Sequence, residues 1–238
     1  MKQEDRIERI FERASKLSSS QSLPLLLSEG EDERVQAAAK ILQKRGISNI
    51  TLLSQSKLQL KGVENQIVSA SPEPELLERL VQRRAKKGMS EEEAVGLLSD
   101  PLYYAAGLLS LGKAAGAVSG AVNTTSDVIR AGLFLLDKSE GIETISSTFF
   151  MILADGQTLT YADCGVIPLP TEDQLADIAL CSAKSHAILS EDDARVAFLS
   201  FSTHGSAKHS SINKLHRALE KVQATDSSLV VDGELQFD

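Results

Sequence analysis

Apolar positions in the first half of this chain form two patterns, short continuous runs and helically spaced residues, which alternate along the sequence. Short apolar runs, which are typical of buried strands, occur at residues 23–27, 50–53 and 66–69. Apolar residues at helical spacing predict amphipathic helices near residues 7–14, 35–42, 74–81, 91–98 and 101–111. Strands that alternate with helices in this way predict an α/β fold with mainly parallel sheets.

The second half of the chain begins with a different pattern. Residues 147–154 and 158–162 are rich in β-forming side chains, and Asp155-Gly156 between them predicts a hairpin. Thr171 and Gln174 form a capping-box pattern, which predicts the start of a long helix. A strand at 195–200, a helix at 211–223 and a strand at 229–231 follow. Because the pattern changes near Gly141, we expect a first α/β domain at residues 1–141 and a second at residues 142–238.

Residues 114–137 contain the strand-to-helix transition that carries the most chemistry. The small apolar run 114–118 predicts a buried strand, and residues 127–137 have apolar side chains at helical spacing. The turn between them is rich in hydroxyl, amide and glycine residues, namely Ser119, Gly120, Asn123, Thr124, Thr125 and Ser126. Such a turn aims several backbone N–H groups and a helix N-terminus at one spot, which favours an anion, usually a phosphate.

Arg130 lies about one turn into this helix, where its guanidinium could bind the same anion. An ordinary helix N-cap without a ligand, formed by Thr124 or Thr125, accounts for the same residues. The pattern by itself leaves both interpretations open.

Two further stretches have a composition that suits phosphate binding. The basic run Arg83-Arg-Ala-Lys-Lys-Gly88 either offsets a helix dipole or clamps the phosphates of a nucleotide-like ligand. The polar turn at residues 202–208 resembles a phosphate cradle in composition, but it lacks the spacing of a nucleotide-triphosphate loop. Neither stretch identifies a ligand without further information.

Composition and the remaining reactive residues exclude several classes of protein. A net charge of −8 without a basic face argues against binding to nucleic acids or anionic membranes. No apolar run approaches the about 20 residues that span a bilayer. Cys164 and Cys181 make no disulfide framework, and Cys164 has no obvious histidine partner, which favours packing over a nucleophilic role. No known metal-site spacing is matched by His204, His209 and His216. We therefore expect a cytoplasmic protein without a metal.

The stretch Val118-Ser-Gly-Ala-Val-Asn-Thr-Thr-Ser-Asp-Val-Ile-Arg130 resembles the Ser-Gly-Ala…Thr-Thr…Arg signature of phosphate acetyltransferases and the related phosphate butyryltransferases. Further resemblances follow in order along nearly the whole chain. They include Glu29-Gly30 with Asp32 and Arg34, residues 87–90, 100–101, 146–147 with 149–151, 162–164 with Pro168 and Pro170, 174–176, 199–203 and 232–238. The chain departs from the family by having Asn123 where histidine is usual and Ala131 where proline is usual.

This resemblance implies two three-layer α/β/α domains with a ligand cleft between them, usually in a homodimer. It also implies reversible transfer of acetyl between acetyl phosphate and coenzyme A, by direct attack of the deprotonated thiol, without a metal or prosthetic group. On this basis Arg84 is the candidate for binding coenzyme A. The candidates for binding phosphate are Arg130, Ser119, Gly120, Thr124 and Thr125, and the second turn adds Ser202 and Thr203. The alternatives are a phosphate butyryltransferase and a non-enzymatic module that binds phosphate or coenzyme A.

The sequence stops at Asp238, inside a motif that the family continues. The resemblance implies a further C-terminal stretch with an Asn-Asp-Leu-Ser-Arg-Gly motif and an aspartate, the proposed acyl-phosphate binders and base. We therefore expect a fragment, a truncated product or one part of a split enzyme, with no catalytic residue assigned. We also expect the 238-residue chain to turn over little by itself.

Overall fold

The structure, a computed structural model, describes residues 2–237. Its contacts divide the chain into two compact units. The first unit is Phe11–Asp137, and the second unit is Met1–Ile10 together with Lys138–Asp238. The division after Asp137 lies close to the boundary expected at Gly141, while the N-terminal residues group with the second unit. The expected limits of the two domains stay a prediction.

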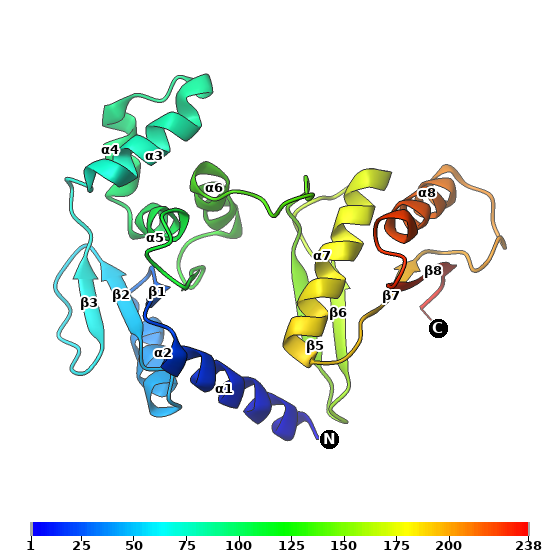
Figure 1. Cartoon of the computed structure of the whole chain (residues 1–238), viewed down its shortest axis with the longest axis horizontal. Coiled ribbons are helices and arrows are strands. Elements are labelled where there is room, and N and C mark those ends of the chain that lie inside the picture. Colours follow the sequence, from blue (N-terminus) through cyan, green and yellow to red (C-terminus); the bar gives the residue numbers. More distant parts are fainter. Residues whose placement is uncertain (1, 238) are drawn as a thin grey trace. The chain divides into compact units, whose positions relative to one another are not determined.

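The first unit contains a four-stranded parallel sheet with the strand order β3-β2-β1-β4 (Figure 1). Its strands are β1 (Leu25–Leu27), β2 (Ile50–Ser54), β3 (Glu64–Ile67) and β4 (Gly116–Val118). The helices up to Asp137 are α1 (Gln3–Ser20), α2 (Glu33–Lys44), α3 (Pro74–Arg84), α4 (Glu91–Leu98), α5 (Pro101–Ser110) and α6 (Thr125–Leu135), with a 3-10 turn at Ala85–Lys87. The parallel pairing confirms the α/β fold with a mainly parallel sheet.

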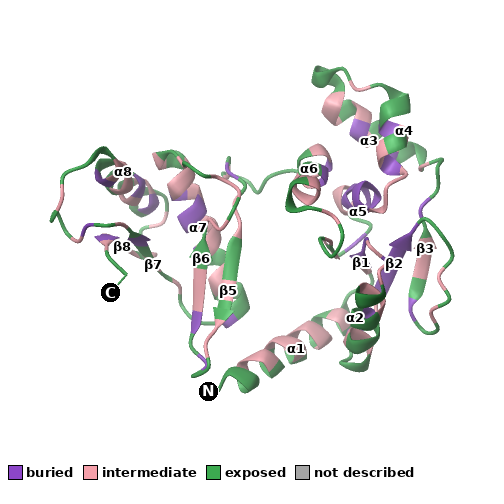
Figure 2. Ribbon diagram, turned by 180° about the vertical axis from the view of Figure 1, so that it is seen from behind, coloured by how far each residue is buried: buried purple, intermediate pink, exposed green. Residues whose placement is uncertain are grey.

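Side chains of the two central strands pack on both faces of this sheet. Leu26 of β1 and Leu53 of β2 pack in a cluster with residues of α3, α4, α5 and α6. Leu27 and Leu52, the alternate residues, pack with residues of α1 and α2 on the other face. Helix α5 is buried from Leu102 to Leu108, as the purple ribbon in Figure 2 shows. Helices on both faces of the sheet form three layers.

Strand β4 lies at the edge of the sheet, although its sequence predicts a buried strand. Among the described residues it pairs with β1 alone, in the register Leu27↔Val118. Val118 is therefore 57% exposed. The prediction of burial was wrong because small apolar side chains suit a central strand and a lightly covered edge strand equally well.

The second unit contains a hairpin and a pair of parallel strands, each packed with helices. Its elements are β5 (Thr148–Ile152), β6 (Thr158–Ala162), α7 (Glu172–Ser190), β7 (Arg195–Leu199), α8 (Ser210–Thr225) and β8 (Val230–Leu235). The antiparallel pairing of β5 with β6 confirms the hairpin predicted at Asp155-Gly156. The capping box between Thr171 and Gln174 is also present. Buried side chains of α7 and α8, such as Ala179 and Val222, pack with Phe198 of β7.

Strand β8 is longer than the sequence predicts. The predicted strand ends at Val231, whereas the ladder with β7 continues to the pair Leu199↔Leu235. Gly233 allows this continuation, because a Cβ atom there would lie 2.6 Å from Cβ of Phe198. Glycine has a low strand propensity, so local preferences predict that the strand ends before Gly233. They give no information on the close approach to Phe198.

Two structural findings bear on the classes excluded by composition. Within residues 2–237, no helix has the length and apolar character needed to cross a membrane. The same residues contain no cluster of three or more His, Cys, Asp or Glu side chains that could hold a metal ion. Cys164 and Cys181 are both free thiols.

Truncation of Leu26 to alanine should destabilise the first unit by about 2–5 kcal/mol, because the fully buried side chain would leave a cavity between the sheet and helices α3 to α6. Urea unfolding followed by circular dichroism measures this loss. Leu133→Ala is the matched control, since Leu133 is 52% exposed and its truncation should cost less than about 0.5 kcal/mol. Equal losses in the two variants would contradict the assignment of Leu26 to the core.

Candidate active site

Residues 119–124 form the turn between β4 and α6, and Thr124 caps the helix. The Thr124 hydroxyl accepts a hydrogen bond from the Asp127 N–H at 3.2 Å and donates to the Asp127 carboxylate at 2.6 Å. Of the two capping residues considered from the sequence, Thr124 is therefore the cap, and Thr125 is the first residue of α6. The connection between β4 and α6 thus brings together Ser119, Gly120 and Thr124, and Thr125 follows them at the start of the helix.

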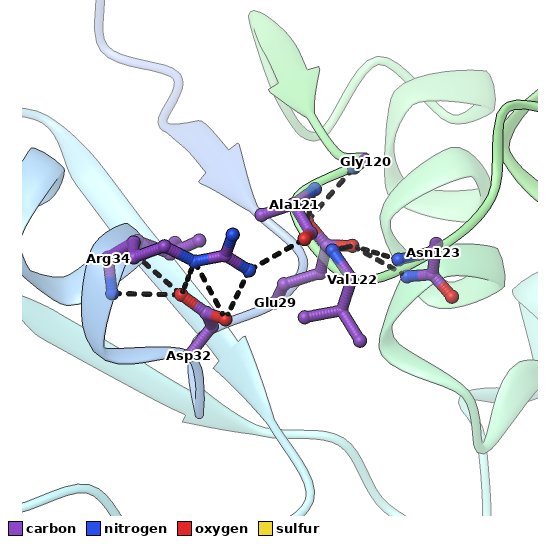
Figure 3. Close-up of polar contacts among 8 residues, drawn as sticks. Glu29, Asp32, Arg34, Gly120, Ala121, Val122 and Asn123 are labelled. Atoms are coloured by element: carbon purple, nitrogen blue, oxygen red, sulfur yellow. Dashed lines mark hydrogen bonds and ion pairs between the residues drawn. The ribbon is translucent and has the colours of Figure 1, made fainter.

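The backbone N–H groups of this turn converge on the carboxylate of Glu29 (Figure 3). One carboxylate oxygen accepts from Gly120 N at 2.9 Å and from Ala121 N at 2.7 Å. The other accepts from Val122 N at 2.8 Å and from Asn123 N at 2.7 Å. The Asn123 side-chain amide donates to the same oxygen at 3.0 Å. Asn123 stands where the resembled family usually has histidine, and it binds Glu29 through both its backbone N–H and its side chain.

The position of Glu29 follows from the strand that precedes it. Strand β1 ends at Leu27, opposite Val118, so the chain beyond it runs beside the turn. The Gly30 N–H donates to the Leu53 carbonyl at 2.9 Å, and a Cβ atom on Gly30 would lie only 2.7 Å from that oxygen. This close approach fixes the backbone directly after Glu29. The hydroxyls of Ser28 and Ser119 are hydrogen-bonded at 2.6 Å, which holds the start of the turn.

Arg34 holds the same turn from its carbonyl side. Its Nη2 atom donates to the Ala121 carbonyl at 2.7 Å and pairs with Asp32 Oδ2 at 2.8 Å (Figure 3). Asp32 is the N-cap of α2, where its side chain also accepts from Arg34 N at 2.8 Å. The hydrogen bonds from the Arg34 side chain lower the pKa of Asp32 to about 2. An ionised carboxylate therefore orients the arginine at neutral pH.

The turn binds an anion, as its composition predicts, but that anion is supplied by the chain itself. Partial burial raises the pKa of Glu29, and the bonds from the four backbone N–H groups outweigh it, so the pKa lies below the usual glutamate value. Within residues 2–237, the N–H groups of Thr125 and Ser126 have no hydrogen-bond acceptor. The binding of a substrate phosphate at this turn stays a prediction, and Thr125, Ser126 and Arg130 are the donors left for it.

An aromatic pair, Tyr103 of α5 and Phe134 of α6, lies between the two candidate cations Arg130 and Arg84. Burial raises the pKa of the Tyr103 phenol, and the positive charge of Arg130 opposes part of that rise. The rings of Tyr103 and Phe134 meet edge to face, with centroids 5.9 Å apart. The Arg84 guanidinium lies over the Phe134 ring, 3.9 Å from its centroid. Arg130 is 56% exposed, and its ion pair with Asp127 is long, at 3.4 Å.

Arg84 also lines a pocket at the end of α3. The pocket has a volume of about 470 Å³ and is lined by Arg84, Lys87, Met89, Glu93, Gly96 and Leu97. Arg84 Nε is buried and has no hydrogen-bond partner in the described part of the chain. Two cations of the basic run therefore line this pocket, and the binding of a nucleotide-like ligand there stays a prediction.

The second polar turn, after β7, is also closed by an internal carboxylate. Ser202 is buried, and its hydroxyl donates to the Glu234 carboxylate, which also accepts from Gly205 N at 2.9 Å. The other Glu234 oxygen faces His216 Nε2 at 3.2 Å. The Ser202 bond is the largest of the contacts that lower the pKa of Glu234 against burial. Thr203 accepts from the Gln236 N–H at 3.0 Å, so both predicted residues hold the end of β8.

Asp163 organises the loop that contains Cys164. Its carboxylate accepts from the Ser147 N–H at 2.8 Å, from the Val166 N–H at 3.0 Å and from the Ile167 N–H at 2.6 Å. Burial raises the pKa of Asp163, but these bonds and the Ser147 hydroxyl hold it well below its usual range. Cys164 Sγ lies 3.0 Å from the Tyr161 carbonyl oxygen, and no hydrogen bond within residues 2–237 joins it to a histidine. This environment supports the packing role favoured from the sequence.

Sequence reasoning missed the partners of both turns. Glu29 lies between the predicted strand at residues 23–27 and the predicted helix near residues 35–42, and Glu234 lies beyond the predicted end of its strand. The available signal was the ordered resemblance at Glu29-Gly30, Asp32 and Arg34, which marks these residues without giving their contacts. Tyr103 and Tyr104 of α5 are 6% and 3% exposed and pack in the core of the first unit.

These features define an α/β protein in which a strand-to-helix turn opens α6, and Phe134 of that helix contacts Arg84 at a cationic pocket formed by α3 and α4. Residues 6–238 match the family model described as phosphate acetyl/butaryl transferase. The chain is 38% identical over 239 residues to a phosphate acetyltransferase of Paracoccus denitrificans, a match that covers 98% of this chain and 73% of the relative. It belongs to the phosphate acetyl/butaryl transferase family.

Other relatives agree with this assignment. A phosphate acetyltransferase of Clostridium acetobutylicum is 37% identical over 250 residues, with 98% of this chain and 74% of the relative covered. Among solved structures, the EutD phosphotransacetylase from Staphylococcus aureus matches with a TM-score of 0.83 at 34% identity. That match covers 100% of this chain and 74% of the other chain.

Substitution of Asp163 by asparagine should destabilise the protein near neutral pH by about 1–2 kcal/mol, because the amide nitrogen replaces an acceptor of backbone N–H groups. The folded-state pKa of Asp163 lies below the value of about 3.9 for an unfolded aspartate. The stabilisation is therefore complete above that value and is lost as the pH falls toward the folded-state pKa. Urea-unfolding free energies of the original protein and Asp163→Asn should converge as the pH is lowered below about 4.

The control is Asp155→Asn, in a hairpin turn where one oxygen accepts a single bond from Gln157 N at 2.9 Å. This variant should show a smaller loss at every pH. A gap between the original protein and Asp163→Asn that does not change with pH would contradict the ionised state of Asp163.

Proposed function

We propose that this chain is an acyltransferase that interconverts acetyl phosphate and coenzyme A with acetyl coenzyme A and orthophosphate. The observation that carries the proposal is the relationship to phosphate acetyltransferases over nearly the whole chain. The site geometry supports it, since α6 begins at a turn suited to phosphate and its Phe134 contacts Arg84, which lines a cationic pocket. Coenzyme A acts in this reaction as a substrate, and no further cofactor is needed.

The Arg84 pocket is the proposed site for the nucleotide end of coenzyme A. Arg84 and Lys87 supply positive charge for phosphate groups, and Met89 and Leu97 supply apolar surface for a heterocycle or an alkyl chain. Stacking on Phe134 holds the Arg84 guanidinium in one orientation before a ligand arrives. A preoriented guanidinium loses less entropy when it binds a phosphate.

The turn before α6 is the proposed site for the phosphoryl group. Arg130 supplies the charge, and the N–H groups at the start of α6 supply donors that the helix itself does not use. Ser119, Gly120, Thr124 and Thr125 form the frame around this position. In the second unit, Ser202 and Thr203 are proposed to contribute to substrate binding through the shape of their turn rather than through free hydroxyls.

In the proposed reaction, a base removes the thiol proton, and the thiolate sulfur forms a bond to the acetyl carbon. The bond between that carbon and the bridging phosphate oxygen breaks, and orthophosphate leaves with the electron pair. Positive charge at the leaving phosphate and donors at the carbonyl oxygen stabilise the transition state. We assign the first of these two tasks to Arg130 and leave the base unassigned.

A cytoplasmic homodimer is the proposed setting of this activity. The free thiols of Cys164 and Cys181 support a reducing compartment. The proposed dimer rests on the resemblance to the family, and sedimentation velocity measures it directly.

Replacement of Arg130 by alanine should lower kcat for coenzyme-A-dependent phosphate release from acetyl phosphate by about 100-fold, because a cation at the leaving phosphate is lost. The assay measures orthophosphate and thioester formation together, on the 238-residue chain and on any longer natural form, because the sequence predicts little turnover by the 238-residue chain alone. Butyryl phosphate, as the competing substrate, distinguishes the two transferase specificities, because butyryl is longer than acetyl by two methylenes and each is worth roughly 10-fold or more in kcat/KM. Arg217→Ala, which removes an exposed arginine paired with Glu172 on the surface, is the control and should retain full activity. Equal activity of both variants would exclude Arg130 from the site.

Replacement of Arg84 by alanine should raise the dissociation constant for coenzyme A by about 10-fold or more, because the pocket loses its oriented guanidinium. Isothermal titration calorimetry measures this change without requiring turnover. Lys86→Ala is the matched control, since Lys86 belongs to the same basic run and does not line the pocket. If both variants bound coenzyme A equally well, the run would act only through its general charge.

A further inference from the structure

We propose that Glu29 is a positioning residue, an internal anion that shapes the turn 119–124 and so sets the phosphate-binding face of α6. The inference rests on the proposed function for its substrate, but the contacts of Glu29 stand independently of it. Glu29 itself does not touch the reacting atoms in this proposal.

Both oxygens of Glu29 are engaged by the turn. They accept five hydrogen bonds from four consecutive residues, Gly120 to Asn123, at distances between 2.7 and 3.0 Å. An ionised carboxylate offers two acceptor oxygens and no donor, which is what a row of four N–H groups requires. A glutamine would direct an NH₂ group at two of these donors. The charge and the shape of Glu29 are therefore both needed.

The contacts of Glu29 bridge distant parts of the chain. Glu29 follows β1, while its donors follow β4, and Arg34 binds the Ala121 carbonyl of the same turn at 2.7 Å. The turn is thus fixed by an anion on its N–H side and a cation on its carbonyl side. Thr124, the next residue, caps α6, so the position of the helix start depends on how the turn is held.

Substrate phosphate is not expected to displace Glu29. Displacement would leave a half-buried carboxylate without its five donors, and loss of partners from such a group is costly. The incoming phosphate instead meets the donors that Glu29 does not use, which are the N–H groups of Thr125 and Ser126 and the side chain of Arg130. The internal anion and the substrate anion thus occupy neighbouring sets of donors.

The second unit repeats this construction with other residues. Glu234 closes the turn after β7 through Ser202 and Gly205, and helix α8 follows that turn. In both units a glutamate from a neighbouring chain segment fills the polar turn between a strand and a helix. The recurrence indicates that the internal carboxylate is a general device of this chain for fixing such turns.

The test compares Glu29→Ala and Glu29→Gln with Glu31→Gln. Glu31 is a matched control because its carboxylate also binds a loop, accepting from Ser56 N at 3.1 Å and from the Ser56 hydroxyl at 2.8 Å, and does not contact the turn 119–124. Calorimetry measures the dissociation constants for inorganic phosphate and for coenzyme A, and phosphate release from acetyl phosphate gives KM and kcat. Amide resonances of residues 120–126 report the shape of the turn.

Both Glu29 variants should weaken the binding of inorganic phosphate and acetyl phosphate by about 10- to 100-fold, because the donors at the start of α6 are no longer held in place. The affinity of the Arg84 pocket for coenzyme A should not change, and Glu31→Gln should resemble the original protein. Sodium formate should restore phosphate binding and the amide resonances of Glu29→Ala, because formate fits the place of the missing carboxylate. In the original protein, formate should only compete with phosphate.

Unchanged phosphate affinity in both Glu29 variants would overturn the proposal. An equal loss of phosphate and coenzyme A affinity, with no rescue by formate, would also overturn it, because Glu29 would then support the fold alone. The proposed function fails separately, if the original protein neither transfers acetyl nor binds acetyl phosphate. In that case formate-dependent recovery of the amide resonances in Glu29→Ala still decides whether Glu29 is the anion that shapes the turn.

Discussion

The candidate active site depends on one interaction, the carboxylate of Glu29 bound by four successive backbone N–H groups. Without an anion, four aligned N–H dipoles at the end of a strand would repel one another and favour a different turn. Glu29 removes that conflict with a charge that belongs to the fold and is present at every substrate concentration. The turn can therefore have its binding shape before a ligand arrives, which reduces the free energy that binding must spend on ordering.

Helix α6 extends the influence of that turn to the second candidate ligand site. Its N-terminus is set by Thr124, its first turns carry Arg130, and its last turn carries Phe134, on which Arg84 stacks. Tyr103 of α5 packs edge to face against Phe134 and lies close to Arg130. A displacement of α6 would thus move both cations together. This arrangement links the two proposed ligand sites through one helix.

Local signals in the sequence predicted most helices and strands correctly. The features that the sequence did not predict depend on contacts between residues far apart in the chain. Helix α4 and the cap at Thr171 were predicted at their observed residues because a helix start is determined by neighbours three or four positions apart. The edge position of β4 depends on pairing with β1, and the continuation of β8 depends on the space beside Phe198. The hydrogen bonds that Glu29 accepts from the turn join residues 91 to 94 positions apart, beyond the reach of any local sequence pattern.

The same reasoning explains why a phosphate-cradle pattern is ambiguous in an acidic protein. Glycine, serine and threonine in a strand-to-helix turn predict that an anion will be bound, and both such turns of this chain do bind one. The pattern does not say whether the anion is a ligand or a side chain, because both satisfy the N–H groups equally. A chain with 33 acidic residues offers many internal candidates. The proposed phosphate site therefore uses donors that lie next to the filled turn rather than inside it.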